Sequence, residues 1–477
     1  MSKVRSALGY SVFSKWLSRA VNMASIVLIA RLLTPEELGL FSIASAITLI
    51  AAELKSFGVG GYLIREEKIN AEKVSNALGL SMILSWGAGL VMVIGSWAIA
   101  DYYEMPDLVF LVQFLSISFF LSPHIGIGKS LLDRYFMFKH KMVAEIASQV
   151  CQFAAAITFI YLGQSYFSLA YSNAIGFGVE LLIILMIKPA LYTVKPAFNK
   201  MKGIAKFGIY VTGTSFVMSM NANMTALIVG KRGTAEEVAY LSRASGFISF
   251  LAGTITSGIR PVVTPYLASK KRDGERYAEA YFHAASLMSS IVIPALAVAG
   301  IASLPVITLF FGDQWGASAP LVSIMCIASS IHFLNTLAPS LLLTGGLEKT
   351  MFLLGLMTLI LNTILIYFLY PFGLIYVPLA DVVTAIMRFV FLSYLFKVKF
   401  EASIKTQLSS LLPIITLTAT CSAWAFIFDH FIMPFSAENA AIVVPLLGVS
   451  TFLVWISTII LTNHPLKIEL KRVVSKK

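Results

Sequence analysis

The sequence has little charge and little cysteine. Aspartate, glutamate, lysine and arginine together make up 13% of its 477 residues, about half of their usual share in soluble proteins. Hydrophobic residues make up 58%, more than a soluble fold can hide from water. The three cysteines, Cys151, Cys326 and Cys421, lie in apolar runs without CxxC spacing, which argues against a disulfide framework or a thiolate metal site. No metal-ligand or catalytic-nucleophile pattern is present, so the composition favours a membrane protein.

In place of charge, the sequence has apolar runs about 20 residues long, the length that crosses a bilayer. About 14 such runs are present, which predicts an all-α polytopic membrane protein with about 14 transmembrane helices. The run over 281–311 contains Pro294 and Pro305, so we expect a kink or a broken end there. The runs lie near 9–30, 38–60, 77–100, 107–128, 143–162, 165–187, 208–230, 239–263, 281–311, 319–344, 350–369, 373–396, 408–428 and 440–462.

The basic residues indicate the orientation of these spans. Lysine and arginine exceed aspartate and glutamate by 36 to 24, a formal net charge of +12. When the spans alternate across the bilayer, most basic residues fall in loops on one side, and Arg31, Lys231 and Arg232 fall on the other. Basic loops mark the cytoplasmic side, so both termini are expected in the cytoplasm. These loops lie against the bilayer, where they meet membrane lipids, and nucleic acid is not an expected partner.

The predicted loops are all short. The longest cytoplasmic loop covers about 188–207, and the longest outer loop covers about 429–439. Neither has room for a soluble domain, so we expect neither an ATPase domain nor an outer catalytic domain.

An internal repeat links two outer loops. Residues 34–45 and 234–245 align without a gap and share a threonine, two adjacent glutamates and the serine and alanine positions that follow. The copies are six spans apart and point the same way, which predicts a parallel repeat of the transporter type, with a substrate site near the midplane between the halves. Alternatively, both segments are only helix N-termini capped by Thr34 and Thr234, but capping does not explain the downstream matches.

The repeat predicts the domain organisation. Spans 1–6 form an N-terminal lobe over residues 1–190, and a cytoplasmic linker covers 191–206. Spans 7–12 form a C-terminal lobe over 207–397, and residues 398–477 hold two extra spans and a basic cytoplasmic tail.

Three segments resemble motifs of Wzx-type oligosaccharide flippases. The segment IARLLTPEELGLF over 29–41 resembles their first-loop signature, and LDRYFMFK over 132–139 resembles their loop between spans four and five. The segment FFGDQW over 310–315 resembles another recurring stretch. Their order and spacing suit the colanic-acid-exporter branch of the multidrug/oligosaccharidyl-lipid/polysaccharide exporter superfamily, and the resemblance covers nearly the whole chain.

This resemblance implies a fold and a cargo. It implies two pseudo-symmetric six-helix lobes around a V-shaped central cavity, in a protein of the bacterial inner membrane. The implied cargo is an undecaprenyl-pyrophosphate-linked oligosaccharide, which is flipped from the inner to the outer leaflet for lipopolysaccharide or exopolysaccharide synthesis. It implies an antiporter driven by a proton or sodium gradient, without a cofactor and without catalysis. A polysaccharide polymerase and a chain-length regulator are the implied protein partners.

Charged residues inside spans are costly and are therefore the candidates for substrate binding. In the first span, Lys15, Arg19 and Asn22 share one helical face, and Arg19 lies about 15 Å deep, near the midplane. An arginine facing a cavity suits a pyrophosphate, because its planar donors match phosphate oxygens. The alternative is a structural ion pair with an acidic residue of a neighbouring span.

Further candidates lie in other spans. The remaining substrate-binding candidates are Lys55, Asn221, Asn223, Arg260 and Arg388, and the ion-coupling candidates are Glu53, Glu180 and Asp381. Each has an alternative interpretation: Lys55 can snorkel to the cytoplasmic surface, Glu53 can neutralise a cation of the first span, and the asparagines can hold helices together.

Several other functions remain open. A lipid II flippase or a drug exporter of the same superfamily is the rival within the class, although an exporter of cations should have an acidic cavity. A surface-polysaccharide polymerase or ligase is the rival from another class, but it should need a sizeable outer loop. A non-transporting scaffold would not need costly charges near the midplane.

Overall fold

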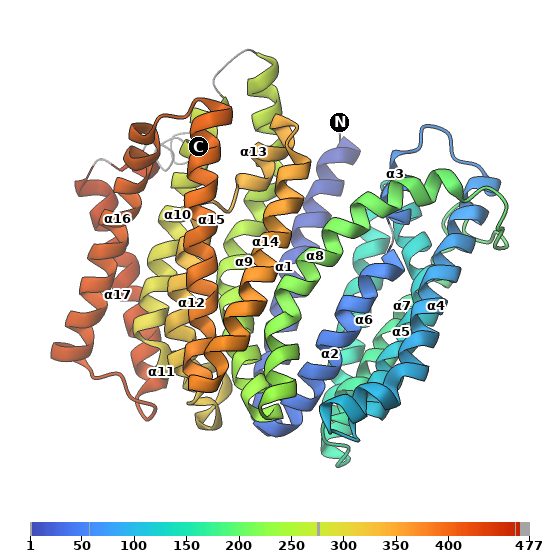
Figure 1. Ribbon diagram of the computed structural model, residues 1–477, viewed down its shortest axis with the longest axis horizontal. Coiled ribbons are helices and arrows are strands. Elements are labelled where there is room, and N and C mark those ends of the chain that lie inside the picture. Colours follow the sequence, from blue (N-terminus) through green and yellow to red (C-terminus); the bar gives the residue numbers. More distant parts are fainter. Residues whose placement is uncertain (1, 57, 274–276, 463, 468–477) are drawn as a thin grey trace. The chain divides into compact units, whose positions relative to one another are not determined.

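The structure is a computed structural model that describes residues 2–56, 58–273, 277–462 and 464–467, and those ranges contain helices and no β-strand (Figure 1). In the described residues, 11 helical stretches are long and apolar enough to cross a membrane. Three other helices, α1 (Ser2–Leu32), α8 (Lys202–Arg232) and α9 (Ala235–Arg272), are equally long but more polar. Together they correspond to the predicted spans, and the all-α polytopic fold is confirmed.

The chain divides into two compact units, Met1–Ala239 and Tyr240–Lys477. In the first unit, α8 packs along α2, although the repeat assigns this helix to the second lobe. The pairs α4–α5 and α6–α7 also pack side by side, and α1 packs on α6. Besides α1 and α8, the helices of this unit are α2 (Pro35–Ser56), α3 (Val59–Arg65), α4 (Ala71–Tyr103), α5 (Leu108–Arg134), α6 (Phe138–Tyr161) and α7 (Phe167–Ile187).

The second unit holds most of α9 and all later elements. Its apolar run over 281–311 is broken at Ala302, as expected, and Pro305 lies in the first turn of the helix that follows, where proline is tolerated. The helices are α10 (Tyr277–Ile301), α11 (Ser303–Phe311), α12 (Ser318–Phe333), α13 (Ala338–Gly345), α14 (Glu348–Leu369), α15 (Val377–Phe400), α16 (Ile404–Ile427) and α17 (Ala440–Leu461), with 3₁₀ turns at Asp313–Trp315, Tyr370–Phe372 and Leu374–Tyr376 and a π-helical turn at Phe428–Ile432.

The two repeated loops fold into the same local structure. The Glu37 amide donates to Thr34 Oγ1 at 3.3 Å, and the Thr34 amide donates to Glu37 Oε2 at 2.7 Å. The Glu237 amide and Thr234 form the same reciprocal pair, at 3.2 and 3.1 Å. Each is a capping box, which satisfies two backbone donors that a helix N-terminus would otherwise leave unpaired. The capping interpretation of these motifs is therefore correct, and the duplication stays a prediction.

Prolines inside the helices leave backbone carbonyls that neighbouring helices satisfy. A proline cannot donate to the carbonyl four residues earlier, and in a bilayer no water replaces that bond. In α5, Pro123 frees the carbonyl of Phe119, which accepts from Ser85 Oγ of α4 at 2.6 Å. In α10, Pro294 frees the carbonyl of Ser290, which accepts from the indole of Trp455 at 3.0 Å. These bonds fix α4 against α5 and α10 against α17.

The segment 188–201 between α7 and α8 contains no helix and is held against α4. Asn76 of α4 is buried, and its Oδ1 accepts from the amides of Asn199 and Lys200 at 3.1 and 3.0 Å. The Ala197 amide donates to the carbonyl of Ser75 at 3.0 Å, and Gly79 lets the Ala197 carbonyl approach where a Cβ would overlap it. The connecting segment is therefore part of the first unit rather than a free loop.

Candidate functional site

In the first unit, the ion pairs of Lys129 join two carboxylates, those of Glu145 and Glu180, to one ammonium. Lys129 Nζ lies 2.9 Å from Glu145 Oε1 and 2.9 Å from Glu180 Oε1. The three side chains come from three helices, and they lie about 8 to 10 Å from the C-terminal end of α5, the N-terminal end of α6 and the C-terminal end of α7. Their exposed fractions are 31%, 26% and 10% in the same order. One ammonium thus joins two carboxylates at one level of the helix bundle.

Charge balance explains why this group is stable. Two oxygens that both lie 2.9 Å from one nitrogen are at most about 6 Å apart, where two carboxylates repel each other by about 3 kcal/mol at an effective dielectric constant of about 20. The Lys129 ammonium adds an attraction to each carboxylate, and these two attractions outweigh the repulsion. Removing one partner of such a half-buried group leaves an uncompensated charge.

Lys55 of α2 contributes a second cation to this group. Its Nζ lies 5.0 Å from the centroid of the Phe119 ring and 5.2 Å from that of the Phe177 ring, and 3.5 Å from Ser118 Oγ. The two aromatic faces hold the ammonium through their quadrupoles. Lys55 interacts electrostatically with Glu180 and with Glu53 of its own helix. The structure thus brings together three sequence-predicted residues, Lys55, Glu53 and Glu180.

The polar face of α1 has a different environment. Lys15 and Asn22 are exposed, and Arg19 is half-buried. Within the described part of the chain, neither Lys15 nor Arg19 forms an ion pair or a side-chain hydrogen bond. The structural ion pair of the alternative interpretation requires a carboxylate beside these two cations, and none of the described residues supplies one.

Asp381 in α15 contacts one polar side chain from α14. Its Oδ1 accepts from Asn362 Nδ2 at 3.2 Å, and Asn362 Oδ1 is buried without a hydrogen-bond partner among the described residues. No lysine or arginine of the described residues forms an ion pair with Asp381. Arg388, also in α15, interacts electrostatically with the buried Tyr281 of α10. Asp381 and Arg388 therefore have separate surroundings.

The remaining sequence-predicted residues lie elsewhere. Asn221 and Asn223 of α8 donate to carbonyls of their own helix, those of Val217 and Ser219, at 2.9 and 2.8 Å. The side chain of Arg260 lies outside the described residues. No cluster of histidine, cysteine, aspartate and glutamate in the described residues could hold a metal ion.

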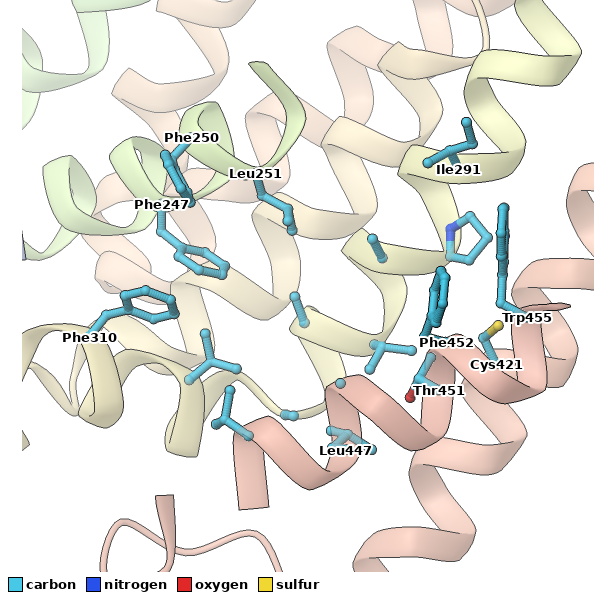
Figure 2. A pocket seen from close by; sticks show the side chains of 18 residues that line it. Phe247, Phe250, Leu251, Ile291, Phe310, Cys421, Leu447, Thr451, Phe452 and Trp455 are labelled. Atoms are coloured by element: carbon cyan, nitrogen blue, oxygen red, sulfur yellow. The ribbon is translucent and has the colours of Figure 1, made fainter. Parts of the chain in front are cut away.

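The second unit also contains an apolar cavity of about 400 Å³ (Figure 2). It lies where α10 carries Pro294, and Trp455 and Phe452 of α17 form one wall. Phe247 of α9 and Phe310 of α11 lie on the opposite side in Figure 2. None of the described residues that line it is charged. Its walls therefore suit a hydrocarbon and do not suit a sugar or a phosphate.

Sequence reasoning missed Lys129 and Glu145. It ended the fourth span at residue 128 and so treated Lys129 as a loop residue, whereas α5 continues to Arg134. Glu145 was not weighed as a charge inside a span. The helical turn that joins Lys129 to Arg134 could have been predicted, because no proline or glycine interrupts residues 129–137. Which carboxylates face Lys129 depends on how α6 and α7 pack.

The fold is that of an all-α polytopic membrane protein, with charged side chains inside several of its long helices. A family model described as "Polysaccharide biosynthesis protein" matches residues 28–320, and the chain belongs to that family. The expected family resemblance is thereby confirmed.

Named proteins support the same assignment. The chain is 21% identical over 354 residues to the teichuronic acid biosynthesis protein TuaB of Bacillus subtilis, covering 72% of each chain. It is also 21% identical over 353 residues to the lipopolysaccharide biosynthesis protein WzxC of Escherichia coli, covering 72% of this chain and 70% of that one. Among solved structures, the lipid II flippase MurJ in its inward closed conformation matches with a TM-score of 0.75 at 17% identity, over 96% of this chain and 99% of that one. At this identity the structural match establishes the fold alone.

Proposed function

We propose that this protein flips an undecaprenyl-pyrophosphate-linked oligosaccharide from the inner to the outer leaflet of the bacterial cytoplasmic membrane, by ion-coupled alternating access. The family assignment supports a role in polysaccharide biosynthesis. The short connections leave no room for a catalytic domain within the described residues, which favours transport over polymerisation. The distribution of basic residues supports a cytoplasmic position for both termini.

The observation that carries this proposal is the pair of unneutralised cations on α1. A charged side chain in a bilayer normally pairs with an opposite charge or faces water or a ligand. Lys129 follows the first course, with two carboxylates at 2.9 Å. Lys15 and Arg19 have no such partner among the described residues. A lipid pyrophosphate supplies the missing negative charge, and the guanidinium of Arg19 can bind two of its oxygens at once.

Ion coupling is assigned to Asp381. Its carboxylate lies inside a span with a single amide donor, Asn362 Nδ2 at 3.2 Å. The neighbouring Asn362 Oδ1 is a second oxygen without a partner in the described chain. A proton or a sodium ion bound there would compensate the charge of the carboxylate. When the two conformations surround Asp381 differently, they bind the ion with different affinities, and this difference couples ion binding to transport.

The lipid tail of the proposed cargo needs an apolar surface, whereas its pyrophosphate headgroup needs a charged or polar one. The cavity beside Pro294 and Trp455 has a volume of about 400 Å³, within the usual range of about 300–1,000 Å³ for ligand pockets. We assign it to a segment of the polyprenyl chain. The pyrophosphate and the tail would then bind to separate parts of the protein, each with matching polarity.

The test is complementation of a strain that lacks this gene. Arg19→Ala should abolish surface polysaccharide and cause lipid-linked repeat units to accumulate, while membrane insertion remains normal on an immunoblot. Arg19→Lys should restore part of the activity, because it keeps the charge but loses the planar pair of donors. Arg31→Ala, at the other end of the same helix, serves as the control and should complement fully.

Three results would contradict the proposal. Full complementation by Arg19→Ala would remove the anion-binding role from α1. Accumulation of lipid-linked repeat units that are already exposed on the outer leaflet would indicate a polymerase instead of a flippase. Rescue of a lipid II flippase depletion, rather than of the polysaccharide defect, would assign the same chemistry to a different lipid-linked cargo.

A further inference from the structure

Lys129 occupies the position that a bound cation would occupy between two carboxylates. Glu145 and Glu180 come from different helices, α6 and α7, and both place an Oε1 atom 2.9 Å from the same nitrogen. Glu180 is the more deeply placed, with a side chain 10% exposed. Carboxylate oxygens from separate helices that converge on one point are the usual ligands of a hard cation. Here the cation is the end of a side chain.

The neighbouring lysine cannot take over this position. Lys55 Nζ is held between the rings of Phe119 and Phe177, at 5.0 and 5.2 Å from their centroids. It interacts with Glu180 only at longer range and forms no ion pair with it among the described residues. Without Lys129, the ammonium of Lys55 would be the nearby positive charge for both Glu145 and Glu180. One of the two negative charges would therefore remain uncompensated.

We propose that Lys129 is a tethered counter-cation, and that removing its side chain opens a site for a monovalent alkali cation between Glu145 and Glu180. Truncation to alanine vacates the space of three methylene groups and the ammonium. The two carboxylates remain on helices that pack tightly against each other, because α6 and α7 are neighbours along their lengths. A sodium or potassium ion that enters this space restores the charge balance that Lys129 maintains.

The wild-type protein should therefore be indifferent to the identity of the monovalent cation at this position. The tethered ammonium is present at a fixed and high local concentration, so a dissolved ion cannot compete with it. In Lys129→Ala, stability should instead rise with the logarithm of the ion concentration, because an ion that binds only the folded state stabilises it by mass action.

The experiment measures thermal unfolding of the purified full chain in detergent by tryptophan fluorescence. Wild type and Lys129→Ala are compared in sodium chloride, potassium chloride and N-methyl-glucamine chloride at equal ionic strength. Sodium that binds at Asp381 shifts wild type and Lys129→Ala equally, so the measured quantity is the difference in midpoint between the two proteins in each salt. We expect the midpoint of Lys129→Ala, relative to that of wild type, to be lowest in N-methyl-glucamine and to rise by several degrees in sodium or potassium.

Two further variants make the result specific. Lys129→Ala combined with Glu180→Gln removes one carboxylate and should lose this rise relative to wild type in sodium and potassium. Lys141→Ala is the matched control, since Lys141 also forms an ion pair in this unit, at 2.7 Å, but with Asp133 alone and with side chains about a quarter exposed. Its midpoint should differ from that of wild type by the same amount in all three salts.

Every outcome decides the proposal. A folded Lys129→Ala whose midpoint differs from that of wild type by the same amount in all three salts would overturn it. A variant that cannot be recovered folded even in sodium chloride would also overturn it, because the free ion should replace the ammonium. The readout is stability, so failure of this inference is distinguishable from failure of the proposed transport function.

Discussion

Replacing Asn76 by alanine should release the segment that connects α7 to α8. Asn76 Oδ1 accepts from two backbone amides, those of Asn199 and Lys200, at 3.1 and 3.0 Å. Its Nδ2 donates to the Glu72 carbonyl of its own helix at 2.9 Å. Alanine cannot replace either acceptor bond. The other attachments of the segment, from Ala197 to Ser75 and from Lys200 to Glu72, remain, so the segment should open more often while the helices stay folded.

The magnitude follows from the two lost bonds. Each hydrogen bond contributes about 1 kcal/mol net, so local opening should become easier by about 2 kcal/mol. Because about 1.4 kcal/mol corresponds to a tenfold change in an equilibrium constant, the open population should rise about 30-fold. The effect is confined to the segment, since both lost bonds end on its own amides, those of Asn199 and Lys200.

Limited proteolysis with trypsin measures this opening directly. Lys200 and Lys202 lie in or next to the segment, and cleavage follows the open population when opening is fast relative to cleavage. The initial cleavage rate between α7 and α8 should rise about 30-fold in Asn76→Ala, in proportion to the open population. Asn223→Ala is the control, because that amide donates to its own helix. A cleavage rate that Asn76→Ala leaves unchanged would refute the reasoning.

Two other predictions concern packing and pH. Gly39→Ala would place a Cβ 1.8 Å from the carbonyl oxygen of Ala235, so its thermal midpoint should fall, with an overpacking cost of about 1–3 kcal/mol; Gly95→Ala, where the added Cβ meets nothing within 4 Å, should not lower it. His464 is buried, which lowers its pKa below the ordinary 6.5, and its Nδ1 accepts from the Leu466 amide at 3.1 Å. Its contribution to stability should be complete above pH 6.5 and be lost as the pH falls through the lowered pKa. The thermal midpoint of His464→Gln should therefore fall less between neutral and acid pH than that of wild type. An equal fall in both proteins would contradict this prediction.

The spans could be predicted because a bilayer imposes a length. A helix must present about 20 apolar residues, and this requirement leaves a strong signal in the sequence. The two capping boxes could also be predicted, since a threonine followed three residues later by glutamate satisfies donors within the same turn. The break at Ala302 followed from two nearby prolines. In each case, the interaction is local along the chain.

The partners of single side chains could not be predicted in the same way. The carbonyl that Pro123 frees was predictable, but the donor that satisfies it, Ser85 Oγ at 2.6 Å, belongs to another helix whose rotation is set by packing. The same holds for Lys129, whose two carboxylates come from two further helices. Hydrophobic periodicity is weak in helices that are apolar all round, so the sequence does not indicate which face of such a helix meets its neighbour.

The partners of the charges distinguish the two units more clearly than the depth of the charges does. In the first unit, the carboxylates of Glu145 and Glu180 already hold an ammonium at 2.9 Å. In the second unit, the side-chain partner of Asp381 among the described residues is an amide, at 3.2 Å. A carboxylate that is neutralised by its own chain gains little from binding an ion, whereas one without a cation among the described residues gains the full charge compensation. Suppose that the two units descend from one duplicated lobe. Lys129 then fills the cation position in the first unit, and a dissolved ion can stabilise the second unit alone. In the proposed mechanism, the ion gradient should therefore act through Asp381 and not through Glu180.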